Sequence, residues 1–203
     1  MMQKLVQVVV VLGIIGLLMF GAGCGDDGEN GESPLIGTEG EAGGLIFYVD
    51  TAGKYPGWTY LEAAPEDIEI YIPDEYHVWE FIWGDIEQKI GGLGSGVGTG
   101  AANTTAIRAA LGDDFFDGEY AARLCDEYAY GGKTDWFLPS LDELATMYAK
   151  LHARGLGDFS AGYWSSTEHE EHANLAWCFR FNDGETRYHS KGAGFRVRPV
   201  RAY

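Results

Sequence analysis

The sequence GGKTDWFLPSLDEL, residues 131–144, predicts a turn, a short buried strand and the start of a helix. The paired glycines interrupt regular structure, and residues 136–138 form a short apolar run. Pro139 ends that run and favours an extended backbone at Leu138. Because these signals agree on a strand-to-helix junction, we expect the rest of the fold to be organised around it.

Ser140 and Glu143 form a capping box at the start of the predicted helix. In such a box each side chain bonds a backbone N–H that the first helical turn leaves unpaired. Apolar residues follow at helical spacing, and the helix is expected to end at Gly155. We interpret the stretch as a scaffold signature, so function has to be inferred from other segments.

Residues 1–23 predict a processing signal rather than part of the fold. Lys4 is the only early charge, residues 5–20 are almost entirely apolar, and small residues precede Cys24. This arrangement resembles a bacterial lipoprotein signal peptide, in which Cys24 becomes the lipidated N-terminus. Gly21 stands where that pattern prefers leucine, so an uncleaved membrane anchor is the alternative. Either way we expect the remainder outside the cytoplasm, and the absence of aspartate after Cys24 favours the outer membrane or cell surface.

Residues 24–43 are expected to be an acidic, glycine-rich tether, because they hold few large apolar residues and cannot fold alone. The glycines follow a period of three that is broken at Pro34. A Gly-X-Y repeat forms a collagen triple helix, but this run is short and poor in proline. A flexible linker is therefore the favoured interpretation.

Residues 44–203 have the length of one domain with a substantial core. Removing residues 1–23 takes away Lys4 and no acid, which leaves 13 basic and 31 acidic side chains, a formal charge of −18. Such acidity disfavours binding to nucleic acid and to anionic membrane surfaces. The six Trp, twelve Tyr and ten Phe residues exceed what a plain core requires, and aromatic surfaces are common where sugars or proteins dock.

The predicted domain begins with a hairpin of residues 44–50 and 58–62. Residues 66–88 are acidic and aromatic without a sustained period, which indicates a long surface loop that either binds a ligand or only covers the core. Residues 90–105 are a glycine-rich loop leading into a helix, and a second helix precedes Gly131. The loop lacks the sequence endings of phosphate-binding loops, so nucleotide binding is disfavoured.

After the central helix the sequence predicts only strands, at residues 163–167, 175–181, 185–190 and 195–201. The Asn-Asp-Gly sequence before residue 185 is a strong hairpin signal. Trp177, Phe179 and Phe181 share one side of their strand, so that side should be buried. Pro199 is expected to confine the end of the last strand to an edge or a bulge.

Five motifs carry a family resemblance: GTGAANT at 98–104, AARLC at 121–125, DWFLPSLDEL at 135–144, YWSSTE at 163–168 and VRPVR at 197–201. In this order they resemble the Lcl C-terminal domain family, named for the C-terminal domain of a bacterial collagen-like adhesin, over roughly residues 43–203. The resemblance implies an α+β, C-type-lectin-like fold, with two or three helices packed on small antiparallel sheets with long irregular loops. It also implies adhesion, a homotrimer and binding of sulfated host glycans, although the acidity of this chain weakens polyanion binding.

The candidate ligand-binding residues lie mainly in the C-terminal segment, where six cations face two acids between residues 180 and 203. Arginine side chains suit sulfate, carboxylate and phosphate alike. The candidates are Arg180, Arg187, Lys191, Arg196 and Arg198, together with Trp164, Asn182 and Asp183. The competing interpretation is that these arginines pair with the chain's own carboxylates, where they contribute little to stability.

Catalysis and metal binding are disfavoured, and no catalytic residue, metal site or cofactor is predicted. Outside the cytoplasm, Cys125 and Cys178 more often form a disulfide than a nucleophile, but strand alternation places Cys178 opposite the aromatic side and leaves their pairing open. Neither cysteine matches a motif of formylglycine-generating enzymes. Residues 168–172 carry metal-ligating side chains, but adjacent loop residues of this kind are usually solvated. Asn182 and Asp183 lack the partner loop of calcium-dependent lectins.

We therefore expect a non-enzymatic cell-surface lipoprotein whose domain binds a glycan or a surface protein. One alternative is a structural envelope lipoprotein without a soluble ligand. The other is an enzyme that resembles formylglycine-generating enzymes.

Overall fold

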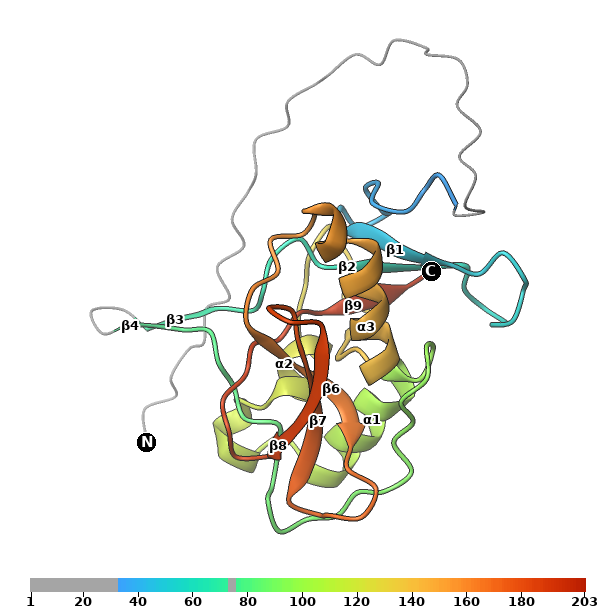
Figure 1. Cartoon of the computed structure of the whole chain (residues 1–203). Coiled ribbons are helices and arrows are strands. Elements are labelled where there is room, and N and C mark those ends of the chain that lie inside the picture. The colour runs from blue at the N-terminus through green and yellow to red at the C-terminus, as the bar shows by residue number, and fades with distance from the viewer. Residues whose placement is uncertain (1–32, 73–75) are drawn as a thin grey trace, which may run out of the picture.

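The computed structural model describes residues 33–72 and 76–203 (Figure 1). The predicted signal peptide, Cys24 and the first part of the predicted tether lie outside the described residues. In the part of the chain that is described, no helix combines the length and the apolar character needed to cross a membrane.

The described chain is a mixture of helices and strands, which confirms the predicted α+β class; its likeness to C-type lectins stays a prediction. The helices are α1 (Gly100–Leu111), α2 (Ala121–Asp126) and α3 (Leu141–Lys150), with short 3-10 helices at Phe115–Gly118 and His152–Arg154. The strands are β1 (Leu45–Val49), β2 (Tyr60–Ala63), β3 (Ile70–Ile72), β4 (Tyr76–Val78), β5 (Trp136–Phe137), β6 (Gly162–Glu168), β7 (Leu175–Arg180), β8 (Glu185–Ser190) and β9 (Val200–Ala202).

The strands form three antiparallel groups: a four-stranded sheet in the order β1-β2-β9-β5, a three-stranded sheet β6-β7-β8, and the β3–β4 hairpin. Helix α3 packs against β1 of the first sheet and against β6 and β7 of the second. Its capping box is present as predicted, since Ser140 Oγ accepts from Glu143 N and Glu143 Oε2 accepts from Ser140 N. The strand-to-helix junction therefore joins the two sheets.

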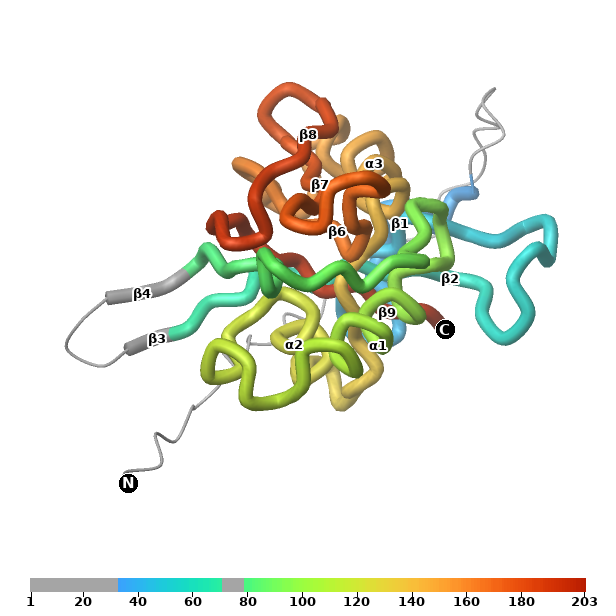
Figure 2. The backbone as a smooth tube through the Cα atoms, turned by 90° about the horizontal axis from the view of Figure 1, so that it is seen from below, coloured from blue at the N-terminus to red at the C-terminus, as the bar shows by residue number. Residues whose placement is uncertain are grey.

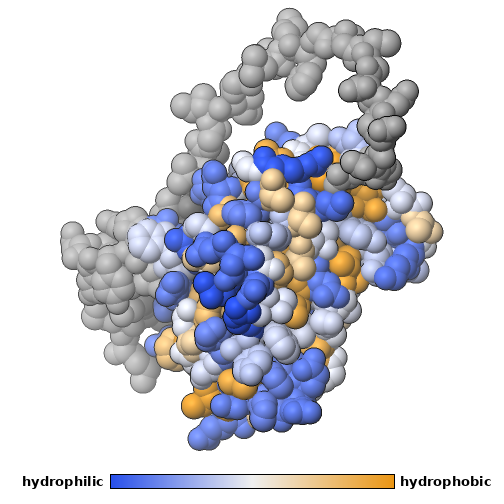
Figure 3. All heavy atoms as spheres, viewed as in Figure 1, coloured by the Kyte–Doolittle hydropathy of each residue, from blue (hydrophilic) through white to orange (hydrophobic). Residues whose placement is uncertain are grey.

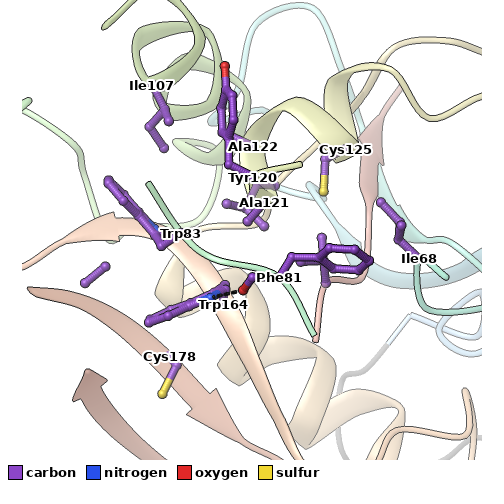
Figure 4. Packing of buried hydrophobic residues seen from close by; sticks show 13 residues of the cluster. Ile68, Phe81, Trp83, Ile107, Tyr120, Ala121, Ala122, Cys125, Trp164 and Cys178 are labelled. Carbon is purple, nitrogen blue, oxygen red and sulfur yellow. Dashed lines mark hydrogen bonds between the residues drawn. The ribbon is translucent and has the colours of Figure 1, made fainter. Parts of the chain in front are cut away.

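The described residues of the segment 66–88 contribute three side chains to the core, which corrects the prediction of this segment as a surface loop. Ile68, Phe81 and Trp83 are buried in the hydrophobic cluster that Figure 4 shows. Trp164 Nε1 donates to Phe81 O at 2.8 Å within this cluster. Figure 2 shows the green chain that precedes α1 running between the β6–β8 strands and helices α1 and α2. A segment whose aromatic residues follow no regular period can therefore pack into the core as irregular structure.

Strand β7 has buried side chains on both faces. Phe179 and Phe181 are buried under α3 as predicted, but Ala176 and Cys178 on the opposite face are fully buried as well. Trp177 shares the face of Phe179 and is only partly buried, so the prediction that this whole side is buried is wrong. Tyr148 of α3 lies against Phe179 and Phe181, with ring centres 5.4 Å and 5.7 Å away, whereas Trp177 packs against His169 and Tyr188.

Residues 33–43, which the sequence assigns to the tether, pack onto the four-stranded sheet. Gly37 N donates to Ile46 O at 2.7 Å. Glu62 of β2 is fully buried and accepts backbone N–H bonds from this segment. The same carboxylate pairs with Arg201 of β9 at 3.0 Å. The described part of the segment is therefore tied to the centre of the sheet.

Strand β9 lies inside its sheet, between β2 and β5, rather than at an edge. Pro199 directly precedes the strand, and its carbonyl oxygen accepts from Ala64 N at 2.9 Å. The missing N–H of Pro199 therefore falls outside the ladder, which is how a proline can border an internal strand.

Candidate functional site

Arg196 and Arg198, two of the predicted ligand-binding residues, pair with a carboxylate of the protein itself. Arg198 Nε donates to Asp67 Oδ1 at 2.6 Å, and Arg196 Nη1 donates to Asp67 Oδ2 at 2.9 Å. The Arg198 side chain is only 3% exposed, and its guanidinium lies over the ring of Phe159. These contacts match the competing interpretation, in which the arginines serve the fold.

Lys191 and Trp164, two further candidates, are both fully buried. Lys191 Nζ donates to Glu168 Oε1 at 2.6 Å and lies 4.7 Å from the centre of the Trp83 ring. Burial raises the pKa of Glu168, but hydrogen bonds from Lys191 and from the Ile90 and Gly91 N–H groups outweigh it, so this pKa lies below its ordinary value. Neither Lys191 nor Trp164 is accessible to a ligand.

The remaining candidates lie at the surface of the β7–β8 hairpin. The Arg180 and Arg187 side chains are 42% and 45% exposed. Arg180 pairs with Asp183 at 3.3 Å, and Arg187 pairs with Glu185. Asn182 is exposed, and its side-chain oxygen accepts from a neighbouring loop N–H. The hairpin thus carries its own counter-charges.

Cys125 and Cys178 are free thiols in the structure, so the disulfide that the sequence leaves open is not formed. Figure 4 shows them on opposite sides of the cluster, with Phe81 and Trp164 between them. Burial raises the pKa of Cys125 well above its ordinary value and raises that of Cys178 to about 11. Because the thiolate is the reactive form, both are poor nucleophiles.

Both thiols are expected to react with a disulfide reagent at least about 100-fold more slowly in the folded chain than in urea. A local opening that costs a free energy of about 3 kcal/mol exposes a buried thiol in fewer than one molecule in about 100. The measurement uses the full-length chain carrying Cys24→Ser, so that only Cys125 and Cys178 contribute. If no thiol reacts in urea without reductant, the two are joined, and this assignment is wrong.

The glycine-rich loop before α1 is filled by the chain's own side chains. Glu143 accepts from Gly98 N at 2.8 Å, and Asn103 Oδ1 accepts from Gly94 N at 3.0 Å. The Gly100 N–H also points at Glu143, at 3.5 Å. An anion would have to displace a buried carboxylate, so this helix start is not a phosphate site.

A cluster of accessible aromatic side chains lies on β7, β8 and the loop between β6 and β7. We call His169, His172, Trp177 and Tyr188 the aromatic platform. Trp177 and His169 are parallel, with ring centres 5.4 Å apart and planes 5° apart. Tyr188 stands perpendicular to both, with ring centres 5.3 Å from Trp177 and 5.0 Å from His169. His172 lies 4.9 Å from His169.

The platform lies on the same face of β7 as Phe179, next to the loop between β6 and β7. Trp177 and Tyr188 are directly paired across the two strands, so their side chains project from the same face. Tyr188 is 52% exposed, and every residue of β8 is exposed. The sheet thus presents two rings to solvent on a rigid element.

Backbone contacts fix the loop that carries the two histidines. His169 N donates to Leu175 O at 3.1 Å, and Glu171 N donates to His169 Nδ1 at 3.2 Å. Lys89 reaches over from the segment before α1 and donates to the His169 and Glu170 carbonyl oxygens. The loop is therefore pre-organised, which reduces the ordering that a ligand would have to impose.

The surface around β6–β8 is mainly hydrophilic. Figure 3, in the same view as Figure 1, shows hydrophobic residues of the described chain in small groups between hydrophilic ones. A protein interface with an apolar centre is a less natural use of such a surface than a polar ligand that needs only a few rings. Among the described residues, no group of three or more His, Cys, Asp or Glu side chains is placed to hold a metal ion.

A second aromatic group, formed by Tyr48, Tyr55 and Trp58, belongs to the β1–β2 hairpin. Tyr55 and Trp58 are stacked with ring centres 4.4 Å apart. All three rings are partly buried, and a side chain at Gly98 would meet Tyr55. This group packs on the glycine-rich loop, so a role in the fold accounts for these three aromatic side chains.

Sequence reasoning did not find the aromatic platform. It assigned Trp177 to the core and Tyr188 to an ordinary strand, and it considered His169 and His172 only as metal ligands. One signal was available: the strand at 185–190 has polar residues on both sides of Tyr188, which is unusual for a buried tyrosine.

Comparison with known proteins places the chain in one family. A family model described as the Lcl C-terminal domain matches residues 87–201, more than half of the chain. No curated protein matches the sequence. The matched segment contains α1 to α3, the β6–β8 sheet and the aromatic platform.

Proposed function

Because the chain belongs to the Lcl C-terminal domain family, we propose that it is an adhesin-like cell-surface lipoprotein whose non-catalytic domain binds a glycan at the aromatic platform. The family supports an adhesin-like surface role. The observation that carries the choice of site is the pair Trp177 and Tyr188, held on paired strands, with Tyr188 52% exposed.

The chemistry of the platform suits a sugar. The faces of aromatic rings carry negative electrostatic potential, and the C–H groups on one side of a pyranose ring are weakly positive. Tyr188, which is 52% exposed, offers a ring face to such a sugar, and Trp177 lies perpendicular to it and in contact with it. Exposed polar residues beside them, including Asn174 and Glu171, offer partners for hydroxyl groups.

The orientation of the domain supports display at a surface. Figure 1 shows the start of the described chain, in blue, at the upper end of the molecule and the β6–β7 loop, in orange, at the lower end. A chain anchored through a lipid on Cys24 would thus hold the platform away from the membrane. The anchor is part of the proposal, as are the outer-membrane location, the homotrimer and the domain boundaries at residues 23 and 43.

Binding is expected to weaken about 10- to 30-fold when Trp177 or Tyr188 is replaced with alanine, because aromatic anchors at a binding centre contribute about 1.4 to 2 kcal/mol. The measurement is a glycan array with the full-length chain in detergent, followed by titration of the bound glycans. Phe116→Ala is the matched control, since Phe116 is 57% exposed in the 3-10 helix Phe115–Gly118, outside the platform.

An unchanged affinity in both platform variants would contradict the site. A blank array together with tight co-purification of an envelope protein would favour the structural alternative. The substitutions Arg196→Ala and Arg198→Ala are unsuitable as binding tests, because they remove the cations that pair with Asp67, which is only 8% exposed and would keep only the Tyr163 hydroxyl as a donor.

A further inference from the structure

We infer that the ligand of the aromatic platform is a glycan without sulfate or carboxylate groups, which rests on the proposed function and specifies its ligand. The inference departs from the sulfated glycans that the family resemblance implies. It follows from where the charges around Trp177 and Tyr188 lie.

The rim of the platform is acidic. Glu170 and Glu171 are exposed in the loop that carries His169 and His172, and neither side chain has a cation within salt-bridge distance among the described residues. Like charges near a binding site repel an approaching polyanion and slow its association. A sulfated sugar stacked on Trp177 would meet this repulsion directly.

The cations nearest to the loop are already engaged. Lys89 donates to the His169 and Glu170 carbonyl oxygens and lies 3.4 Å from Glu168. Lys191 is fully buried against Glu168. A sulfate at the platform would have to draw Lys89 out of the contacts that hold the loop.

The exposed arginines project from the other side of the sheet. Trp177 pairs with Tyr188 across β7 and β8, whereas Arg187 pairs with Cys178, the next residue along β7. Successive side chains of a strand point to opposite faces, so Arg187 and the platform lie on opposite faces. Arg180 is three residues from Trp177 and also lies on the opposite face. Neither arginine can contact an anion that is stacked on the platform.

A glycan with only hydroxyl, acetamido or amino groups meets complementary chemistry instead. Its ring C–H groups stack on Trp177 and Tyr188, and its O–H or N–H groups donate to the Glu170 and Glu171 carboxylates. Such charge-assisted hydrogen bonds are stronger than neutral ones. The formal charge of −17 for the whole chain also repels anionic glycans at long range.

The test presents neutral glycans and the same glycans after chemical sulfation to the full-length chain in detergent, at low and at high salt. We expect binding of neutral glycans and at least about tenfold weaker binding of their sulfated forms at low salt, with a smaller difference at high salt because salt screens the repulsion. The double variant Glu170→Gln, Glu171→Gln should reduce the discrimination at low salt. The variant Arg180→Ala, Arg187→Ala should leave it unchanged.

The outcomes separate the two proposals. Tighter binding of sulfated forms that is lost in Trp177→Ala would overturn this inference and leave the platform as the site. Tighter binding of sulfated forms that is lost only in Arg180→Ala, Arg187→Ala would overturn both. An array without binding of either form would overturn the proposed function, and the inference with it.

Discussion

Replacing Glu168 with alanine is expected to lower the free energy of unfolding by about 3 to 5 kcal/mol, the range for removing one partner of a buried ion pair. Lys191 has no exposed side-chain surface and would be left in the interior without its counter-ion, with the Gln88 carbonyl as its remaining hydrogen-bond acceptor. The Ile90 and Gly91 N–H groups would also lose their acceptor. Urea unfolding of the full-length chain, followed by tryptophan fluorescence, measures the change.

Two controls make this prediction specific. The double variant Glu168→Ala, Lys191→Met should lose less stability than the sum of the single changes, because it leaves no unpaired charge buried. Glu185→Ala breaks an exposed pair with Arg187 and should change stability by less than about 1 kcal/mol. Equal effects of Glu168→Ala and Glu185→Ala would show that the buried pair does not hold the fold.

Glu143 is expected to make the folded chain less stable as the pH rises from about 4.5 to about 7. The side chain is fully buried, and burial raises its pKa from an ordinary 4.5 to about 7, although N–H groups of Ser140, Gly98 and Gly100 lower it in part. Between these two values the folded chain binds a proton that the unfolded chain has released, so the free energy of unfolding falls with pH. A difference of 2.5 in pKa corresponds to about 3 kcal/mol.

Urea unfolding of the wild type and of Glu143→Gln between pH 4 and pH 8 isolates this contribution. Glutamine does not ionise, so the difference in stability between the two chains should change by about 3 kcal/mol across this range. Glutamine also places an amide N–H group near a backbone donor, and we expect an additional loss of about 1 to 3 kcal/mol at every pH. A constant difference between the two chains would contradict the raised pKa.

The motifs that reveal the family are those that build the scaffold. Asn103 fastens the glycine-rich loop, Glu143 joins that loop to α3, and Glu168 pairs with Lys191. Arg198 and Arg201 complete buried ion pairs. Because these groups are buried and polar, each needs particular partners, and this need makes their spacing recognisable in the sequence.

The sequence predicts more of the fold than of the candidate site. Helix starts, the Asn-Asp-Gly hairpin and most strands follow from local signals such as the capping box. The partial exposure of Trp177 depends on its packing against His169 and Tyr188, which strand alternation alone does not predict. The partners of the late arginines depend on Asp67, more than a hundred positions earlier in the chain. The amino-acid composition gives the net charge of the chain but not where the charged side chains lie in the fold.

The attachment of residues 33–43 to the sheet has a mechanical consequence. A surface protein that holds its target is pulled between that target and its anchor. Tension arriving along the N-terminal segment would reach β1 first, through the bonds of Gly37 and Thr38 to Ile46, and then β2 and β9 through Glu62 and Arg201. The β6–β8 sheet, which carries Trp177 and Tyr188, would take the load at the other end, and α3 packs against both sheets. A target bound at the proposed site would therefore load both sheets, which are joined through α3.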